Sequence, residues 1–393
     1  MNYRKDIKSG NELSILGFGC MRLPGAFGKP DMKKSEELLM TAYNNGINYF
    51  DTAYLYPGVE ETVGAIFAKN GIRDKVNIAA KLPHGLCKKY EDFDRFFNIE
   101  LERLQTEYID YYLVHNITSF AVWQKAVDLG IKDWIRSKKE TNKVRRIGFS
   151  FHGPAKDFPK IIDDFDFDFV QIQYNYINTN YQAGTEGLKY AHSKGLPVII
   201  MEPLLGGKLV NGLPEGAIKE MNKTNSWSPA KWGLKWLYSQ KEVTVVLSGM
   251  NEMKQLEENL QIVSDEKVGE FSEEETETIE RVIKAFEKAY KVRCTGCNYC
   301  QPCTVGINIP ACFTAYNNSY AINWMAGEFG YITQSGAMSG KSTYASDCIA
   351  CGKCEKQCPQ HIEIIKELKN VKRRFEIPGL KTGVKIANKI MRK

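Results

Sequence analysis

Short apolar runs alternate with longer amphipathic stretches along the first two thirds of the chain. An apolar run of about four to eight residues predicts a buried strand, and apolar residues three or four positions apart predict a helix. The predicted strands cover residues 16–21, 47–50, 76–80, 109–114, 147–150, 169–173, 197–201 and 243–247. A predicted helix follows each strand. Eight strand–helix pairs within about 250 residues are typical of a (β/α)8 TIM barrel.

An open, doubly wound sheet is the alternative fold for alternating strands and helices. Its first turn usually carries three glycines and opens a helix. The corresponding stretch here, Gly17-Phe-Gly-Cys-Met-Arg22, has two glycines and precedes no predicted helix. The pattern therefore favours the closed barrel, preceded by a small hairpin over residues 3–15.

Charge is distributed unevenly along the chain. The net charge is +6, yet residues 366–393 hold ten Lys or Arg and two Glu, so the rest of the chain is slightly acidic. The basic residues thus belong to the tail, and we expect no nucleic-acid binding by the barrel. The N-terminus lacks the apolar core of a signal peptide, and no apolar run approaches the ~18 residues of a membrane span. We expect a cytoplasmic protein.

Nine of the eleven cysteines lie between residues 294 and 358. They include two runs with short spacing, Cys294-x2-Cys297-x2-Cys300-x2-Cys303 and Cys348-x2-Cys351-x2-Cys354-x3-Cys358-Pro359. In a reducing compartment, dense cysteines indicate metal rather than disulfides. Structural zinc needs four ligands, usually in two pairs, so two runs of four supply too many thiolates for it. The runs favour iron–sulfur clusters.

The second run is the bacterial ferredoxin run, in which three cysteines hold one [4Fe–4S] cluster and the fourth holds another. The segment therefore resembles a two-cluster ferredoxin domain. This resemblance implies one cluster on Cys294, Cys297, Cys300 and Cys358, and a second on Cys348, Cys351, Cys354 and Cys303. The first run has one residue fewer before its last cysteine, and Thr304 stands where proline is usual. Cys312 is the alternative to Cys303.

These patterns divide the chain into four parts. We expect a barrel over residues 1–265, a linker helix over 266–292, a small α-helical, ferredoxin-like iron–sulfur domain over 293–368, and a basic tail over 369–393.

Polar side chains close three consecutive predicted strands: Asp51, Lys81 and His115, with Tyr56 in the loop after the first. In a TIM barrel such strand ends meet at one face. A tyrosine with a pKa of ~10 is a poor acid at neutral pH, but a buried lysine beside it favours phenolate and lowers that pKa. We expect a catalytic group in which Asp51 holds Lys81, Tyr56 is the general acid and a neutral His115 orients the substrate oxygen.

The motifs Asp51-Thr-Ala-x-x-Tyr56, Ala80-Lys81 and Leu113-Val-His115 resemble the catalytic tetrad of the aldo-keto reductase superfamily. The resemblance covers roughly residues 5–265. It implies NADPH or NADH bound in an extended form across the barrel mouth.

The resemblance also implies positions for cofactor contacts. Ser150 and Gln171 would face the nicotinamide carboxamide, Met201 takes the place of a ring that stacks on the nicotinamide, and the adenine would lie near Glu258 and Asn259.

Two positions depart from the family pattern. The usual Ser-Asn pair reads Ser150-Phe-His152, and a role for His152 stays open. Gln255 stands in place of the arginine that clamps the NADP 2′-phosphate. Because a neutral amide does not replace a bidentate guanidinium, NADH becomes a candidate beside NADPH.

We therefore expect an enzyme, an oxidoreductase that reduces an aldehyde or ketone, or oxidises the alcohol, and is coupled to or regulated by two [4Fe–4S] clusters. Nicotinamide passes two electrons as hydride whereas a cluster passes one. A bound flavin stays open as a bridge, and so does a partner protein, a ferredoxin or flavoprotein. Two alternatives remain: an electron-transfer protein whose barrel is a docking scaffold, or clusters that only stabilise the fold or sense oxygen.

Overall fold

The computed structural model describes residues 1–26, 29–265, 269–294, 296, 299–321, 323–332 and 342–384. The chain forms two compact units. One comprises Met1–Leu204 with Ala230–Phe271, and the other comprises Leu205–Pro229 with Ser272–Lys393. Residues 205–229, which the sequence places within the barrel, thus group with the C-terminal part. The four boundaries expected from the sequence stay a prediction.

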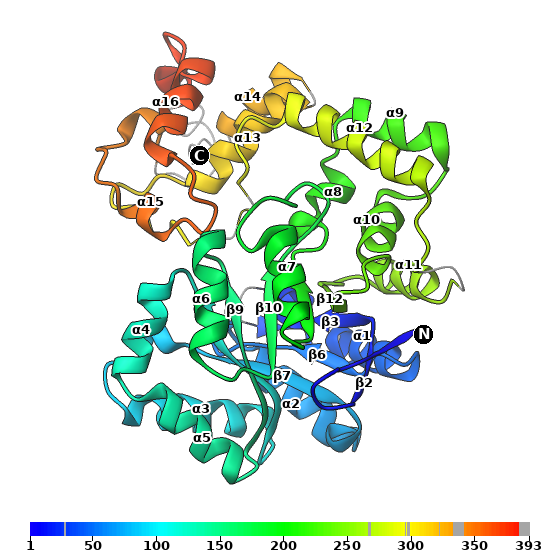
Figure 1. Cartoon of the computed structure of the whole chain (residues 1–393). Helices are drawn as coiled ribbons and strands as arrows, with labels where there is room; N and C mark the ends of the chain where they lie inside the picture. Colours follow the sequence, from blue (N-terminus) through cyan, green and yellow to red (C-terminus); the bar gives the residue numbers. More distant parts are fainter. Residues whose placement is uncertain are drawn as a thin grey trace. The chain divides into compact units, whose positions relative to one another are not determined.

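Eight parallel strands close into a barrel in the first unit (Figure 1). The order around the barrel is β10-β11-β12-β3-β6-β7-β8-β9. The strands are β3 (Leu16–Gly19), β6 (Tyr49–Asp51), β7 (Asn77–Leu82), β8 (Ile109–Ile117), β9 (Val144–Phe151), β10 (Phe169–Gln173), β11 (Val198–Met201) and β12 (Val243–Ser248). All eight overlap the predicted strands. The predicted TIM barrel is confirmed.

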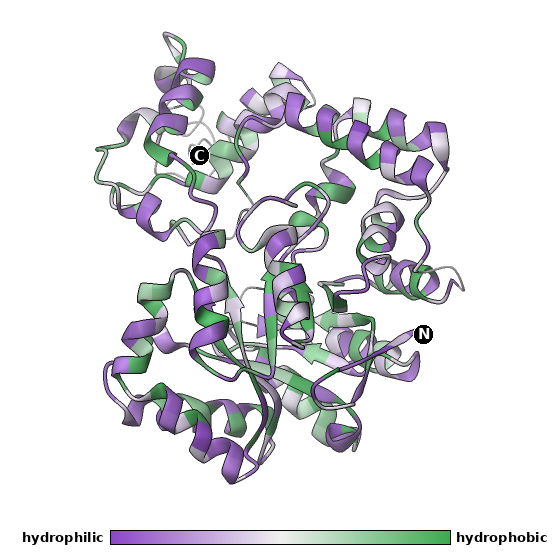
Figure 2. Ribbon diagram, in the orientation of Figure 1, coloured by the Kyte–Doolittle hydropathy of each residue, from purple (hydrophilic) through white to green (hydrophobic). Residues whose placement is uncertain are grey.

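Helices surround the strands and turn apolar faces toward them (Figure 2). They are α1 (Met32–Asn44), α2 (Val59–Lys69), α3 (Glu91–Leu104), α4 (Phe120–Asp128), α5 (Ile131–Glu140), α6 (Phe158–Asp164), α7 (Gly184–Ser193), α10 (Pro229–Tyr238) and α11 (Met253–Val263). The sequence predicted one helix around residues 121–137. That prediction was wrong, because Gly130 has φ +89° and separates α4 from α5.

The barrel interior is filled by side chains. Leu13 from the hairpin β1 (Tyr3–Lys5) and β2 (Glu12–Ser14) shares one buried cluster with Tyr49, Tyr111 and Phe169 of the strands. Gly17 is needed in this packing, since a Cβ there would lie 2.7 Å from a methyl group of Val245. A packed interior leaves the strand ends as the place for chemistry.

The second unit is mainly helical. Its helices are α8 (Lys208–Asn211), α9 (Glu215–Thr224), α12 (Glu273–Ala289), α13 (Ile309–Ala321), α14 (Trp324–Ile332), α15 (Lys353–Gln357) and α16 (Ile364–Phe375). The predicted linker helix is present as α12, and Ser272 and Glu275 form its capping box. The sequence did not predict α8 or α9. Helix α16 crosses residue 368, where the sequence placed the end of the cysteine-rich domain.

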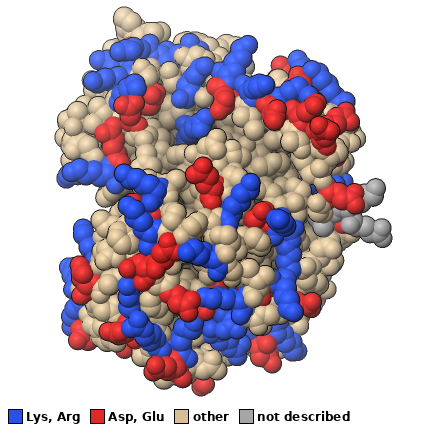
Figure 3. Space-filling view, in the orientation of Figure 1, with Lys and Arg blue, Asp and Glu red and all other residues tan. Residues whose placement is uncertain are grey.

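On the face drawn in Figure 3, Lys and Arg side chains are intermixed with Asp and Glu side chains. None of the helices in the described part of the chain is long and apolar enough to cross a membrane.

Candidate functional site

Asp51, Lys81 and His115 lie near the C-terminal ends of the neighbouring strands β6, β7 and β8. Parallel pairing places these strand ends at one face, with Asp51 opposite Ala79 and Lys81 opposite Leu113. Tyr56 lies in the connection between β6 and α2 and is partly buried. The structure therefore brings together the four side chains that the sequence proposed as catalytic.

Lys81 and Asp51 form a buried ion pair. The Lys81 Nζ lies 2.5 Å from Asp51 Oδ1 and donates to the Thr52 carbonyl at 2.7 Å. The same Nζ lies 5.2 Å from the centre of the Tyr56 ring. The rings of Tyr56 and His115 meet edge to face, with their centres 6.1 Å apart. The Lys81 ammonium group and the His115 imidazole thus both lie next to the Tyr56 ring.

The protonation of these groups follows from burial. Burial raises the pKa of Tyr56 well above its ordinary value, and Asp51, Cys20 and Glu202 raise it further. The sequence predicted a lowered pKa, which was wrong because burial disfavours the phenolate and the negative charge of Asp51 disfavours it further. Burial lowers the pKa of His115 well below its ordinary value, with Lys81 adding to the effect. Tyr56 is therefore a neutral phenol and His115 a neutral imidazole.

A second pair of buried acids lies behind Lys81. Glu60 of α2 and Glu100 of α3 are fully buried. Glu100 accepts the backbone N–H of Lys81 at 3.2 Å and a hydrogen bond from the Tyr112 hydroxyl. Glu60 accepts from Arg103 at 3.2 Å. Burial is the largest cause that raises the pKa of both carboxyl groups, that of Glu60 to about 7 and that of Glu100 well above its ordinary value.

This pair predicts that the barrel loses stability as pH rises from 6 to 8. A carboxyl group whose pKa is raised on folding stabilises the fold below its unfolded-state pKa, and this contribution is lost as pH rises through its folded-state pKa. We expect Glu100→Gln, which keeps the acceptor for Lys81, to reduce the pH dependence of the melting temperature by a few degrees. Melting followed by tryptophan fluorescence at both pH values measures it.

Glu61→Gln is the matched control, because Glu61 is the exposed neighbour that pairs with Arg103 at 3.0 Å. It should leave the pH dependence as in the parent protein. An equal pH dependence in Glu100→Gln and the parent would contradict the shared role of the two buried acids.

The two residues expected at the carboxamide already have protein partners. Gln171 donates from Nε2 to Asp51 Oδ2 at 2.8 Å, so it fixes the second oxygen of the carboxylate that Lys81 holds. The Ser150 hydroxyl oxygen accepts the backbone N–H of Asn116 at 2.7 Å, which leaves its O–H free to donate. Both side chains lie on strands next to the catalytic group, and their contact with a cofactor stays a prediction.

The other expected cofactor residues are Met201 at the end of β11 and Glu258 and Asn259 in α11. Met201 is the last residue of β11 and packs on the interior cluster. Asn259 of α11 is buried and donates to the Ser248 hydroxyl at 2.8 Å, while Glu258 is partly exposed. Gln255 accepts the backbone N–H of Asn251 at 3.0 Å, so its amide oxygen is used in the first turn of its own helix.

Gln173 lies at the same barrel face and was not predicted from the sequence as a site residue. It ends β10, two residues after Gln171, and therefore points to the same interior side as Gln171 and Phe169. Gln173 is fully buried, and neither atom of its amide has a hydrogen-bond partner among the described residues. It pairs in register with Met201. The strand-end position was a signal that could have identified it.

Further polar groups surround the same barrel face. Burial lowers the pKa of His152 to about 4, although its hydrogen bond with Gln182 acts in the opposite direction. Asn116, near the end of β8, and Glu202, just after β11, have φ +59° and +53°, a region that non-glycine residues rarely adopt. Such strain often occurs at functional sites. Buried atoms without partners in the described part of the chain, His115 Nδ1 and Asn116 Oδ1, fit a polar ligand such as nicotinamide.

The cysteines of the second unit border one apolar core, which includes Val292, Ile307 and Phe313. Those that lie in or against this core are Cys294, Cys300, Cys303, Cys312, Cys348, Cys354 and Cys358. Cys351 is exposed, and its sulfur lies 3.7 Å from the Thr304 hydroxyl. Thr304 follows Cys303, so the two runs approach each other where the sequence predicts shared ligands.

Cys297 lies outside the described residues. Among the residues that are described, no three Cys, His, Asp or Glu side chains are placed so as to hold a metal ion. The described cysteines are also free of disulfides. Thiols from both runs around one core suit iron–sulfur clusters in donor chemistry and in the adjacency of the runs.

Comparisons with known proteins agree with this architecture. The model of the aldo/keto reductase family matches residues 15–284, and that of the 4Fe-4S dicluster domain matches residues 293–363. The chain is 23% identical in sequence to the aldo-keto reductase AKR11C1 from Bacillus halodurans (holo form), with a TM-score of 0.61 over 72% of this chain and 97% of that one. This structural likeness shows the fold.

Curated relatives include enzymes. The chain is 29% identical to L-galactose dehydrogenase of Arabidopsis thaliana over 65% of this chain and 86% of that protein. It is 24% identical to L-glyceraldehyde 3-phosphate reductase of Escherichia coli O157:H7 over 67% of this chain and 88% of that protein. An oxidoreductase barrel is thus followed by an iron–sulfur domain.

Proposed function

We propose that this chain, which belongs to the aldo-keto reductase family, reduces an aldehyde or ketone, or oxidises the alcohol, with Tyr56 as the proton donor or acceptor. The observation that carries the proposal is the position of Lys81 Nζ, 2.5 Å from Asp51 and 5.2 Å from the centre of the Tyr56 ring. A lysine held in this way can stabilise negative charge on the neighbouring phenol oxygen.

In the direction of reduction, a bound nicotinamide cofactor supplies hydride to the carbonyl carbon. Tyr56 gives its proton to the carbonyl oxygen, and Lys81 stabilises the phenolate that remains. The neutral His115 orients that oxygen. Asp51 and Gln171 keep Lys81 in position through the contacts at 2.5 and 2.8 Å. Oxidation of the alcohol uses the same groups in reverse.

NADH is a cofactor candidate beside NADPH. Gln255, which stands in place of the 2′-phosphate clamp, is a neutral residue of α11 whose amide oxygen accepts the backbone N–H of Asn251, just before the helix. It cannot form the bidentate charged contact that an arginine makes with a phosphate. The expected cofactor contacts at Ser150, Met201, Glu258 and Asn259 belong to this proposal.

Gln173 should contribute to cofactor binding. Its buried amide has no partner among the described residues and lies beside Met201, so a bound carboxamide would complete its hydrogen bonds. We expect Gln173→Leu to weaken NADH binding by about 10-fold, in line with ~1.4 kcal/mol for one hydrogen bond. Quenching of intrinsic fluorescence by NADH measures the dissociation constant.

Gln182→Leu is the comparison variant, because Gln182 is a buried glutamine of the same barrel face that pairs with His152. It should change NADH affinity less than Gln173→Leu. Equal affinities in the parent and Gln173→Leu proteins would contradict the role of Gln173.

Hydroxylated aldehydes are the first substrates to test. Two relatives are named for L-galactose and for L-glyceraldehyde 3-phosphate. The polar residues around the catalytic group, His152 and Glu202 among them, are suited to hydrogen bonds with substrate hydroxyl groups.

We further propose that the C-terminal domain carries two [4Fe–4S] clusters on the eight cysteines of the two runs, including Cys297. A cluster transfers single electrons, so a bound flavin or a ferredoxin or flavoprotein partner is needed to couple it with hydride chemistry. Two residues of the second run support access for a partner, since Cys351 is exposed and Ile349 is 61% exposed.

Anaerobic titration of the iron-loaded protein with NADH and then NADPH tests this coupling, with dithionite as the positive control. Reduction of the clusters by a nicotinamide, seen as visible bleaching and an EPR signal, is expected if a flavin is bound. Reduction by dithionite alone would indicate that the barrel and the ferredoxin domain work separately, and an external partner protein would be tested next. The alternative, an electron-transfer protein with a scaffold barrel, predicts no carbonyl reduction in either case.

A further inference from the structure

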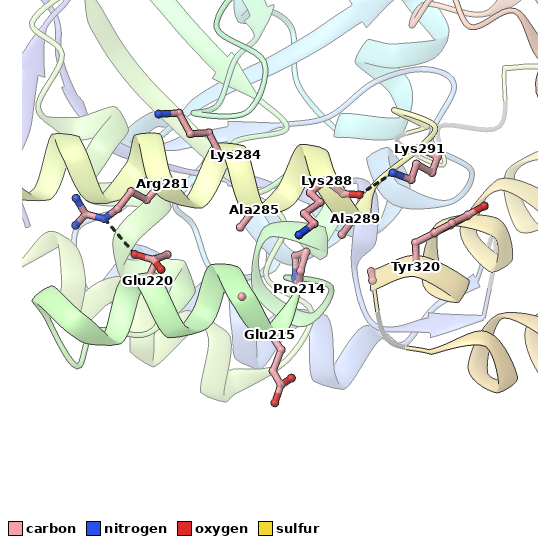
Figure 4. Close-up of a pocket in the computed structure, with 12 residues that line it drawn as sticks. Pro214, Glu215, Glu220, Arg281, Lys284, Ala285, Lys288, Ala289, Lys291 and Tyr320 are labelled. Atoms are coloured by element: carbon pink, nitrogen blue, oxygen red, sulfur yellow. Dashed lines mark hydrogen bonds and ion pairs between the residues drawn. The ribbon is translucent and has the colours of Figure 1, made fainter.

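A groove in the second unit lies between α9 and α12 (Figure 4). Its volume is about 780 Å³. Small side chains line it, namely Gly216 of α9, Ala285 and Ala289 of α12, and Ala321 of α13. Tyr320, 40% exposed, lies at one end. A hollow of this size is within the usual range for small-molecule sites.

The charges along this groove are not balanced. Arg281 pairs with Glu220 of α9 at 3.1 Å, and Glu220 also pairs with Lys223 at 2.6 Å. By contrast, Lys288 and Lys291 are exposed and take part in none of the ion pairs that the described residues form. The groove therefore has an acidic group, Glu220, that is already paired, whereas the lining residues Lys284, Lys288 and Lys291 form no ion pair among the described residues.

Lys288 and Lys291 both line the groove, and Lys291 contacts Tyr320 at one end. In Figure 4, Lys288 extends from α12 toward Pro214, whereas Lys284 turns away from α9. Lys291 Nζ donates to the Lys288 carbonyl at 2.7 Å and lies 5.2 Å from the centre of the Tyr320 ring. On the same ring lies the guanidinium of Arg374, at 4.4 Å. Two cations, Lys291 and Arg374, thus contact the Tyr320 ring, and Lys288 lies along the wall of the groove.

Two carboxylates also line the groove. Glu220 is held by Arg281, and Glu215 points away from α12 in Figure 4, with Lys219 at 3.8 Å. Neither carboxylate compensates Lys288 or Lys291. The positive charges of Lys288 and Lys291 also interact favourably with the dipole at the C-terminal end of α12. That interaction requires neither a groove nor a cation stacked on Tyr320.

We propose that this groove is a binding site for a small, multiply charged anion, a phosphate ester, polyphosphate or polycarboxylate. Its charged groups would pair with Lys288 and Lys291 and its body would lie on the alanine-lined floor. A small ligand fits better than an acidic protein surface, because Lys288 and Lys291 line one hollow instead of spreading over a face of about 800 Å².

The test is calorimetric titration of the iron-loaded protein, anaerobically at low salt, with inorganic pyrophosphate and with tricarballylate. We expect saturable binding of at least one of them, with a rise in melting temperature. Lys288→Gln combined with Lys291→Gln should weaken it at least 10-fold. Lys366→Gln combined with Lys369→Gln, which removes the same charge from exposed positions on α16, should change it less than twofold.

Each outcome decides the proposal. Binding of pyrophosphate alone identifies a phosphate site, and binding of tricarballylate alone identifies a carboxylate site. Absence of binding for both at millimolar concentration would overturn the proposal. So would equal weakening in the two double variants, because it would show non-specific attraction by net charge. The iron content of each variant checks that the fold is retained.

Discussion

Replacing Tyr56 by phenylalanine is expected to lower kcat for carbonyl reduction by about 100- to 10,000-fold, the usual contribution of a general acid. The ring stays, with its contacts to Lys81 and His115, and only the proton-bearing oxygen is lost. Because burial keeps the Tyr56 pKa well above its ordinary value, the phenol is protonated throughout the neutral range. Steady-state oxidation of NADH in the presence of an aldehyde measures the effect.

Tyr54→Phe is the matched control. Tyr54 lies two residues earlier in the same connection, and its ring packs on Phe96 and on Arg103 instead of Lys81. Its loss of a hydroxyl should change kcat less than threefold, and NADH affinity should be unaltered in both variants. Retention of full activity in Tyr56→Phe would exclude Tyr56 as the acid and favour the scaffold alternative.

Replacing Cys354 by alanine is expected to remove one of two clusters. A protein with two [4Fe–4S] clusters holds about eight iron atoms, so the variant should keep about four. Cys354 packs partly buried against the core of the second unit, and loss of a cluster there should also lower the melting temperature of that unit. Iron analysis and EPR of the dithionite-reduced protein measure the change.

Cys312→Ala is the control that also decides between two ligand sets. Cys312 is 4% exposed and lies within the apolar core, whereas Cys303 lies at its border next to Thr304, close to Cys351. We therefore expect Cys312→Ala to retain all iron and Cys303→Ala to lose about half. The reverse result would assign Cys312 as the ligand.

The same experiments separate the alternatives for the role of the clusters. If they only stabilise the fold, Cys354→Ala should melt earlier while aldehyde reduction by the surviving protein is unchanged. If they exchange electrons with a partner, reduction of the remaining cluster by dithionite should persist while transfer to the partner falls. The two readouts differ because hydride transfer at Tyr56 needs no single-electron carrier.

Much of the barrel could be predicted from the sequence. Its strands are buried on both sides, so each is a short apolar run, and the polar residue that ends such a run stands out. Asp51, Lys81 and His115 were found in this way, and Tyr56 by its place in the next loop. The cysteine runs were equally direct, because three ligands of each cluster come from one run of closely spaced cysteines.

The tertiary structure decided what depends on contacts between distant elements. Different strands and helices supply the contact of Gln171 with Asp51 and that of Glu100 with the Lys81 backbone. The burial of the Gln173 amide without a partner among the described residues has the same origin. No local sequence pattern records which side chains meet. The raised pKa of Tyr56 also has this origin, since its burial and the nearby Asp51 carboxylate are properties of the assembled barrel. The chain alone thus determined the barrel and the residue types of its site, whereas packing set their partners and charges.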